Sequence, residues 1–147
     1  MRQAYRVVAG LIAIGVLVQA AAIAMGWFMV IAESEDADVV LNADYEGNFG
    51  HALHGIVGLT IMPVLGLLLL IFSFFAKFPG SVKWAGFTFL AIVVQVALAF
   101  ISFGVGELGF LHGLNAFVIL GLAATAARRA TVADRVTADG RTATASV

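Results

Sequence analysis

The chain has 147 residues, of which 62% are hydrophobic and only 12% are charged, and it contains no cysteine. Soluble domains are nearer half apolar and a quarter charged, so this composition excludes an ordinary soluble domain and predicts an all-α integral membrane protein. The lack of cysteine excludes disulfides, thiolate metal sites and iron–sulfur clusters. Histidine, carboxylate, amide and methionine side chains remain as candidate ligands.

Four apolar segments follow one another along the chain, each near or above the roughly 20 residues needed to cross a bilayer. They cover approximately residues 7–31, 51–76, 84–103 and 108–127. The first segment follows Arg2 and Arg6 in the manner of a signal peptide. Its apolar run exceeds the usual signal core of ~7–15 residues, which favours a retained helix. We therefore expect a four-helix transmembrane bundle over residues 1–127.

The segments that flank the predicted spans alternate between basic and acidic along the chain. All eight lysines and arginines fall in segments that an even number of crossings puts on one side of the membrane, and every acid except Asp134 and Asp139 falls on the other. The positive-inside rule therefore predicts cytoplasmic N- and C-termini in a bacterial-type plasma membrane. Residues 128–147 contain few large apolar side chains, which predicts a mobile cytoplasmic tail.

Two pairs of segments resemble each other. "VLVQAAAIA" in the first span and "IVVQVALAF" in the third align Gln19 with Gln95, while "ALHGIVGL" and "FLHGLNAF" align His54 with His112. The pattern predicts two pseudo-repeated helical hairpins related by an axis along the membrane normal, with chance similarity between apolar helices as the alternative. A hydrogen-bonded clamp between Gln19 and Gln95 is the structural interpretation of the two amides, and a polar lining for a cofactor or a proton path is the functional alternative.

His54 and His112 lie at similar depth, a few residues inside helices that both enter from the outer side. If the second and fourth helices face each other, two imidazoles at matched depth can hold one haem b by bis-histidine ligation near the outer face. Gly55 and Gly113 would leave room for the macrocycle, although small residues also let membrane helices pack closely. The alternative is a pair of interfacial histidines bonded to backbone carbonyls.

His51 lies one turn above His54 on the same helix face. It can bond a haem propionate, accept a proton, help hold a second metal with Glu46 or Asp44, or be a solvated interfacial histidine. Asn115, one turn below His112, can orient that imidazole or a substrate. The outer side offers haem propionates no lysine or arginine, which is the one observation against haem.

"HALHG" paired with "FLHGLNA", together with the two glutamines, resembles one half of the haem A synthase family. The resemblance covers the layout of residues ~5–127 but only short motifs in sequence, and it implies haem ligation by His54 and His112. That family's carboxylate is here His51, the following arginine is Gly55, and its outer-loop cysteine pair is absent. The resemblance therefore implies a haem-b-type bundle without haem hydroxylation. The chain also looks like small bacterial four-helix membrane proteins.

The preferred hypothesis is a b-type haem protein that transfers electrons, or handles haem, for another membrane or redox protein. A homo-oligomer is the other arrangement considered, and a stand-alone enzyme is not favoured. One alternative is a non-catalytic accessory subunit of a larger membrane complex. Another is a copper or other transition-metal site that uses His51 and His54 with the acidic loop. No motif indicates a nucleic-acid partner, and no helix has a transporter's array of charges.

Overall fold

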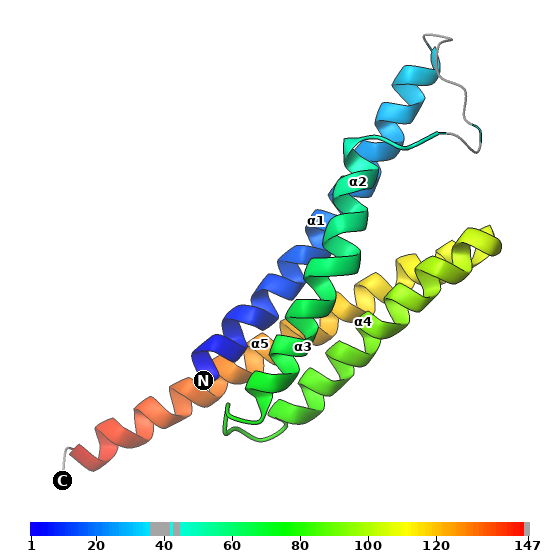
Figure 1. Cartoon of the computed structure of the whole chain (residues 1–147). Coiled ribbons are helices and arrows are strands. Elements are labelled where there is room, and N and C mark those ends of the chain that lie inside the picture. Colours follow the sequence, from blue (N-terminus) through cyan, green and yellow to red (C-terminus); the bar gives the residue numbers. More distant parts are fainter. Residues whose placement is uncertain (36–41, 43–44, 146–147) are drawn as a thin grey trace.

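The computed structural model describes residues 1–35, 42 and 45–145, with side chains as far as Asp139. These residues form helices, without a β-strand among them. The elements are α1 (Arg2–Glu35), α2 (Phe49–Ile56), η1 (Val57–Ile61), α3 (Met62–Ser73), α4 (Ser81–Gly104), η2 (Gly106–Leu108) and α5 (Gly109–Ala145). Figure 1 shows that α2 and α3 follow one another in a single rod, with the π-helix η1 between them.

Four helical stretches are long and apolar enough to cross a membrane, as the sequence predicts. They are Arg2–Glu35, Phe49–Ser73, Ser81–Gly104 and Gly106–Asp139. Large apolar side chains such as Phe28, Phe103 and Phe117 are exposed on their outer faces. A soluble protein of this size rarely exposes so much contiguous apolar surface, so these faces suit a hydrocarbon environment. The all-helical prediction is confirmed.

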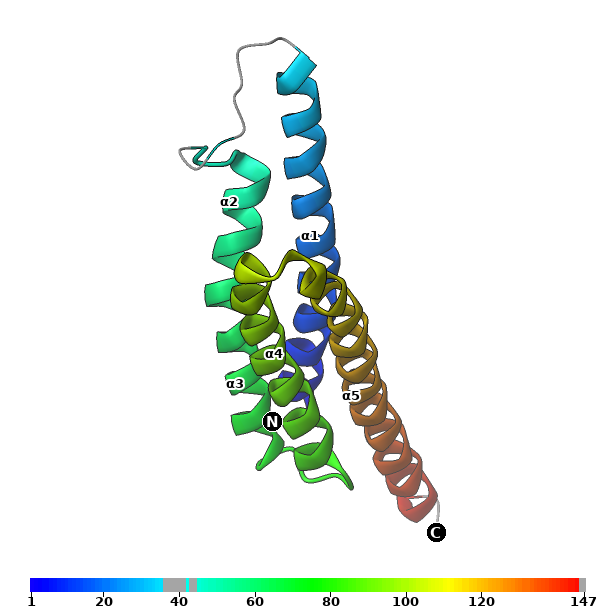
Figure 2. The same ribbon diagram turned by 90° about the vertical axis from the view of Figure 1, so that its right-hand side faces the viewer.

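The two hairpins pack side by side, but only over part of their length. α1 packs against α5 and α3 packs against α4, so α1, α3, α4 and α5 follow one another around the bundle. α2 packs against α1, and within the described residues it makes no extensive contact with α4 or α5. Figure 1 shows the consequence, because the α1–α2 arm and the α4–α5 arm diverge toward one end. Figure 2 shows both chain termini at the opposite end.

Buried positions of α1 recur in α4. Four of the buried residues of α1 have buried counterparts in α4: Tyr5, Ala9, Ile12 and Val16 correspond to Ser81, Ala85, Thr88 and Ile92. Each residue of the α4 set lies 76 positions after its counterpart in α1. One of these pairs, Tyr5 and Ser81, is also joined by a hydrogen bond. The first helix of each hairpin therefore turns the same face toward the rest of the bundle.

The second helix of each hairpin follows the same rule with one interruption. Buried residues are Met62, Gly66, Leu69 and Ser73 in α3, and Ile119, Ala123, Ala126 and Ala130 in α5. Their offset is one residue smaller than the offset between His54 and His112. The π-helix η1, where the N–H of Met62 donates to the carbonyl of Val57, accounts for this difference. A π-turn inserts one extra residue into a helix, and Pro63 beyond it cannot donate a backbone hydrogen bond.

The end of the bundle domain differs from the prediction. α5 does not stop at residue 127 but continues to Ala145, with Ala130 buried against the rest of the bundle. Farther along α5, the carboxylate of Asp134 pairs with Arg2 at 3.2 Å and with Arg6 at 3.4 Å. Residues 128–145 of the predicted tail thus lie in α5, and the mobility of this segment stays a prediction. A count of large apolar residues misses alanines, which let helices approach closely. Residues 146–147 lie outside the described part.

Polar contacts join three segments at the end where the termini lie. The Tyr5 hydroxyl donates to the carbonyl of Ser81 at 3.1 Å, and its ring packs edge-on against Phe78 at 5.2 Å between centroids. The guanidinium of Arg2 donates to the carbonyls of Ala76 and Lys77, at 3.4 and 3.3 Å. These bonds tie α1 to the turn between α3 and α4, so the hairpins are fastened together at this end.

Candidate cofactor site

His54 of α2 and His112 of α5 lie next to each other in the structure. Their ring centroids lie 6.2 Å apart, with an angle of 56° between the ring planes, and both side chains are half-buried. Helices α2 and α5 belong to different hairpins, so residues far apart in the sequence supply the two imidazoles. The structure thus brings together the two histidines that the repeated "LHG" motif singles out.

Each imidazole is held by the same kind of bond. Nδ1 of His54 lies 3.0 Å from the backbone carbonyl oxygen of Gln19, and Nδ1 of His112 lies 3.1 Å from that of Gln95. A carbonyl oxygen can only accept, so Nδ1 must be the protonated nitrogen in both rings. In the neutral imidazole, Nε2 then keeps its lone pair. Neither ring makes another hydrogen bond within the described part of the chain.

Each of the two histidines is followed by a glycine whose Cβ position is unobstructed by other helices. A Cβ atom placed on Gly55 or on Gly113 would meet no other atom within 4 Å. Elsewhere in the first hairpin, glycines mark close approach, because a Cβ on Gly50 would collide with the backbone of Gly26. Gly55 and Gly113 are therefore not needed for packing between these helices.

The glutamine side chains behave differently in the two hairpins. The Asn115 side-chain amide donates to Gln95 Oε1 and to the carbonyl of Ala91, both at 2.8 Å. Gln19 Oε1 is buried and has no hydrogen-bond partner among the described residues. Val57 lies three residues after His54, where the second hairpin has Asn115 three residues after His112. The first hairpin thus lacks the amide that would satisfy Gln19.

The predicted clamp between Gln19 and Gln95 is absent from the described residues. Gln95 bonds within its own hairpin, and the helices that carry the two glutamines lie diagonally across the bundle. Asn115 makes no hydrogen bond with His112 in the described part of the chain. It holds the side chain of Gln95, the residue whose backbone carbonyl orients that imidazole. The sequence pattern identified Gln19 and Gln95 as a matched pair. It gave no sign that their backbone carbonyls bond to the histidines.

His51 lies at the first turn of α2 and closes its N-terminus. Asn48 accepts hydrogen bonds from the backbone N–H groups of Gly50 and His51, while the backbone N–H of Asn48 donates to His51 Nδ1 at 3.4 Å. This reciprocal pair is a capping box. The ring of His51 also packs edge-on against Trp27, with 5.4 Å between the centroids. His51 therefore has a structural role in this helix end.

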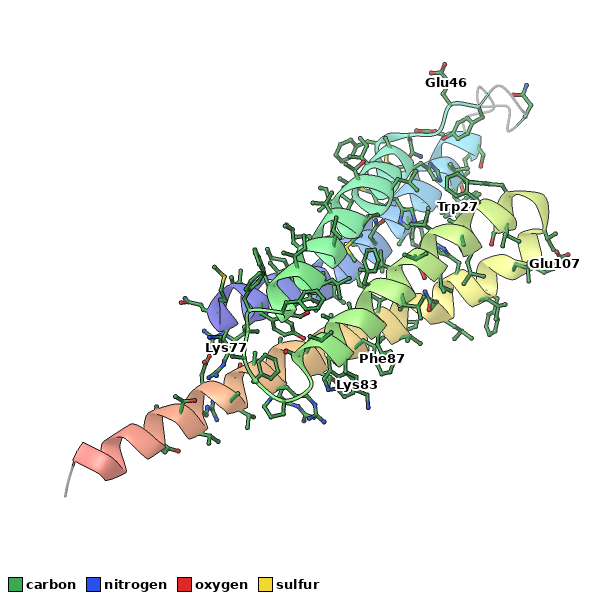
Figure 3. All side chains as sticks on the ribbon, turned by 60° about the horizontal axis from the view of Figure 1, so that its bottom comes forward. Trp27, Glu46, Lys77, Lys83, Phe87 and Glu107 are labelled. Atoms are coloured by element: carbon green, nitrogen blue, oxygen red, sulfur yellow. The ribbon has the colours of Figure 1, made fainter. Side chains whose placement is uncertain are left out.

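A second metal site beside His51 stays a prediction. Within the described residues, no group of three or more histidine and acidic side chains gathers in a way that could hold a metal. Asp44, one of the carboxylates proposed for that site, lies outside the described residues. Glu46 lies at the same end of the molecule as Trp27, as Figure 3 shows.

Comparison with known proteins gives no match to this chain among protein-family models, characterised proteins or solved structures. The resemblance of "HALHG" and "FLHGLNA" to one half of the haem A synthase family therefore stays a prediction based on those motifs. Functional inference rests on the geometry of the two histidines and on the arrangement of the four helices.

Proposed function

We propose that this chain is a multi-pass protein of a bacterial-type plasma membrane that holds one haem b between His54 and His112. In this proposal both termini are cytoplasmic and the two hairpins are pseudo-repeats. The separation of charge supports this orientation, because Lys77 and Lys83 lie at the end opposite Glu46 and Glu107 in Figure 3. The recurrence of the buried positions in the two hairpins supports the repeat.

The observation that carries the haem proposal is the spacing of the two imidazoles. Two metal–nitrogen bonds of about 2.0 Å each, with each nitrogen about 1 Å from its ring centre, separate the ring centres by about 6 Å. The rings of His54 and His112 are 6.2 Å apart. Both rings have Nδ1 engaged and Nε2 available, as metal-binding histidines usually do.

Different residues of the chain would orient the two ligands and support them. The carbonyls of Gln19 and Gln95 keep the proton on Nδ1 of each imidazole, which makes Nε2 the more basic ligand atom. Asn115 holds Gln95 in place. When bound, haem supplies one-electron transfer at its iron. A single site near one end of the bundle cannot carry an electron through the whole bilayer, so a redox partner or a haem-receiving partner is part of the proposal.

A second candidate is a non-catalytic accessory subunit of a larger membrane complex. Two observations favour it: both imidazoles already bond to backbone carbonyls, and the end with Glu46 and Glu107 offers no lysine or arginine among the described residues. Haem propionates commonly meet such cations, and here they would have to reach water or uncharged polar groups. In this reading, His54 and His112 only join the helices of each hairpin.

An absorption spectrum of the purified full-length protein separates the two candidates. For the haem protein, we expect a Soret band that sharpens on dithionite reduction and is lost in His54→Ala and in His112→Ala. His51→Ala is the matched control and should keep the band, because His51 bonds within its own helix end. A protein that stays colourless after incubation with haemin would refute the haem proposal and support the accessory subunit.

A further inference from the structure

At the end of the bundle with the termini, two aromatic rings of α4 each lie under a cation. Trp84 and Phe87 pack edge-on, with 6.4 Å between their centroids. The guanidinium carbon of Arg129, on α5, lies 4.9 Å from the centre of the Trp84 ring. Nζ of Lys83 lies 5.8 Å from the centre of the Phe87 ring. Figure 3 shows Lys83 and Phe87 together on α4. We call Lys83, Trp84, Phe87 and Arg129 the aromatic–basic cluster.

The positive charge of this cluster is not balanced by the acids described nearby. Asp134 is engaged by Arg2 and Arg6, and these are the two salt bridges found in the described residues. Neither Lys83 nor Arg129 forms one, and both side chains are exposed, as is Arg128 beside them. Cation–π contacts hold the two charged groups over the rings but leave their N–H donors available. The N–H donors of Lys83 and Arg129 are therefore held in place by the rings and have no anionic partner among the described residues.

We propose that the aromatic–basic cluster binds the phosphate headgroup of an anionic phospholipid. The proposal rests on the membrane insertion of the chain and is independent of haem. Trp84 lies in the first turn of a predicted span, at the depth where aromatic rings meet headgroups. An arginine over an aromatic ring offers the edge of its guanidinium to a phosphate. Phe87, exposed and one turn deeper, provides an apolar surface for an acyl chain.

Trp84 allows a direct test, because the chain has only two tryptophans. Trp27→Phe leaves Trp84 as the single tryptophan of the full-length protein, and its fluorescence is excited selectively over that of the two tyrosines. This protein is placed in phosphatidylcholine vesicles with a minor fraction of brominated phosphatidylglycerol, or with the same fraction of brominated phosphatidylcholine. We expect stronger quenching of Trp84 by the brominated phosphatidylglycerol. Equal quenching by the two lipids would overturn the proposal.

Variants in the same background assign the preference to the cluster. A basic residue near the surface contributes about 1 kcal/mol to attraction of anionic lipid, so Arg129→Gln and Lys83→Gln should each weaken the preference about fivefold. Arg135→Gln removes one charge elsewhere on α5 and should leave it unchanged. An equal loss in Arg135→Gln would mean general surface attraction and would overturn the proposal. Inorganic phosphate is added as a second control. If it abolishes the preference for phosphatidylglycerol, the site binds free phosphate and the proposal of a lipid headgroup is overturned.

These measurements need no haem, so a failure of the haem proposal does not affect them. Helix content of each variant is followed by circular dichroism. Both substituted side chains are exposed, and we expect native helix content in Lys83→Gln and Arg129→Gln.

Discussion

The hairpin formed by α1 to α3 and the hairpin formed by α4 and α5 build the same histidine site from different supports. Both bond a histidine Nδ1 to the backbone carbonyl of a glutamine on the preceding helix, at 3.0 Å and 3.1 Å. In the second hairpin Asn115 fixes that glutamine, whereas in the first Gln19 Oε1 has no partner among the described residues. The first hairpin instead has a close backbone contact at Gly26 and Gly50. Each histidine is thus oriented alike while its surroundings differ.

This difference teaches that two histidines can be oriented by the same kind of bond while the side chains around them differ. The histidine–carbonyl bond uses a backbone atom of the glutamine, so the same bond can form with different side chains around it. The supports can then change separately, by close packing in one hairpin and by an amide network in the other. We expect substitutions at corresponding positions to have unequal effects in the two hairpins.

The largest effect is expected from a methyl group at the close contact of the first hairpin. Gly50→Ala places a Cβ against the backbone of Gly26 and against the carbonyl of Ala22. Backbone atoms cannot move aside as a flexible side chain can, so we expect a loss of about 1–3 kcal/mol in stability. Thermal unfolding in detergent, followed by circular dichroism, measures it.

Gly86→Ala in α4 is the matched control for this substitution. A Cβ there meets no atom within 4 Å. Replacing glycine by alanine inside a helix then leaves only the gain in helix propensity, and we expect up to about 1 kcal/mol of added stability. A Gly50→Ala protein as stable as Gly86→Ala would contradict the close contact.

An intermediate effect is expected from removing the amide support of the second hairpin. Asn115→Ala removes two hydrogen bonds of 2.8 Å and leaves Gln95 Oε1 without its donor. Outer-shell partners of a metal ligand typically contribute 10–100-fold to affinity. Asn115 acts through Gln95, so we expect about a tenfold loss in haem affinity, measured by haemin titration. The loss should appear with the Soret band position and helix content retained.

Asn115→Gln tests whether the amide itself matters. It keeps an amide that can reach Gln95, and we expect partial recovery of haem affinity relative to Asn115→Ala. If Asn115→Ala binds haemin as tightly as the unmodified chain, Asn115 does not support His112.

The smallest effect is expected from giving the first hairpin the support that it lacks. Val57→Asn places an amide three residues after His54 and next to Gly58, where an added Cβ would touch the side chain of Gln19, so we expect the new amide to donate to Gln19 Oε1. Interhelical hydrogen bonds in membranes contribute about 0.6 kcal/mol on average, so we expect a small rise in the unfolding temperature. The same substitution with Gln19→Ala should be destabilising, because the new amide is then buried without a partner. A gain that persists without Gln19 would exclude this bond as its cause.

The sequence by itself determined the helical class and the residues worth testing. Apolar runs of spanning length predict the four helices, because a bilayer requires both length and hydrophobicity. His54 and His112 stand out because polar residues are rare in such runs and both follow a leucine and precede a glycine. Neither inference needs knowledge of which helices are neighbours.

Only the tertiary structure decided how these residues are supported. Gln95 pairs with Asn115 rather than Gln19 because α1 and α4 lie diagonally across the bundle, and hydropathy does not encode this lateral order. The backbone carbonyls that hold the imidazoles leave no trace in side-chain identity. The continuation of α5 beyond residue 127 likewise depends on Ala130 and Asp134 meeting α1. Local sequence does not distinguish one possible hydrogen-bond partner from another. The contacts between segments far apart in the chain decide which pair forms.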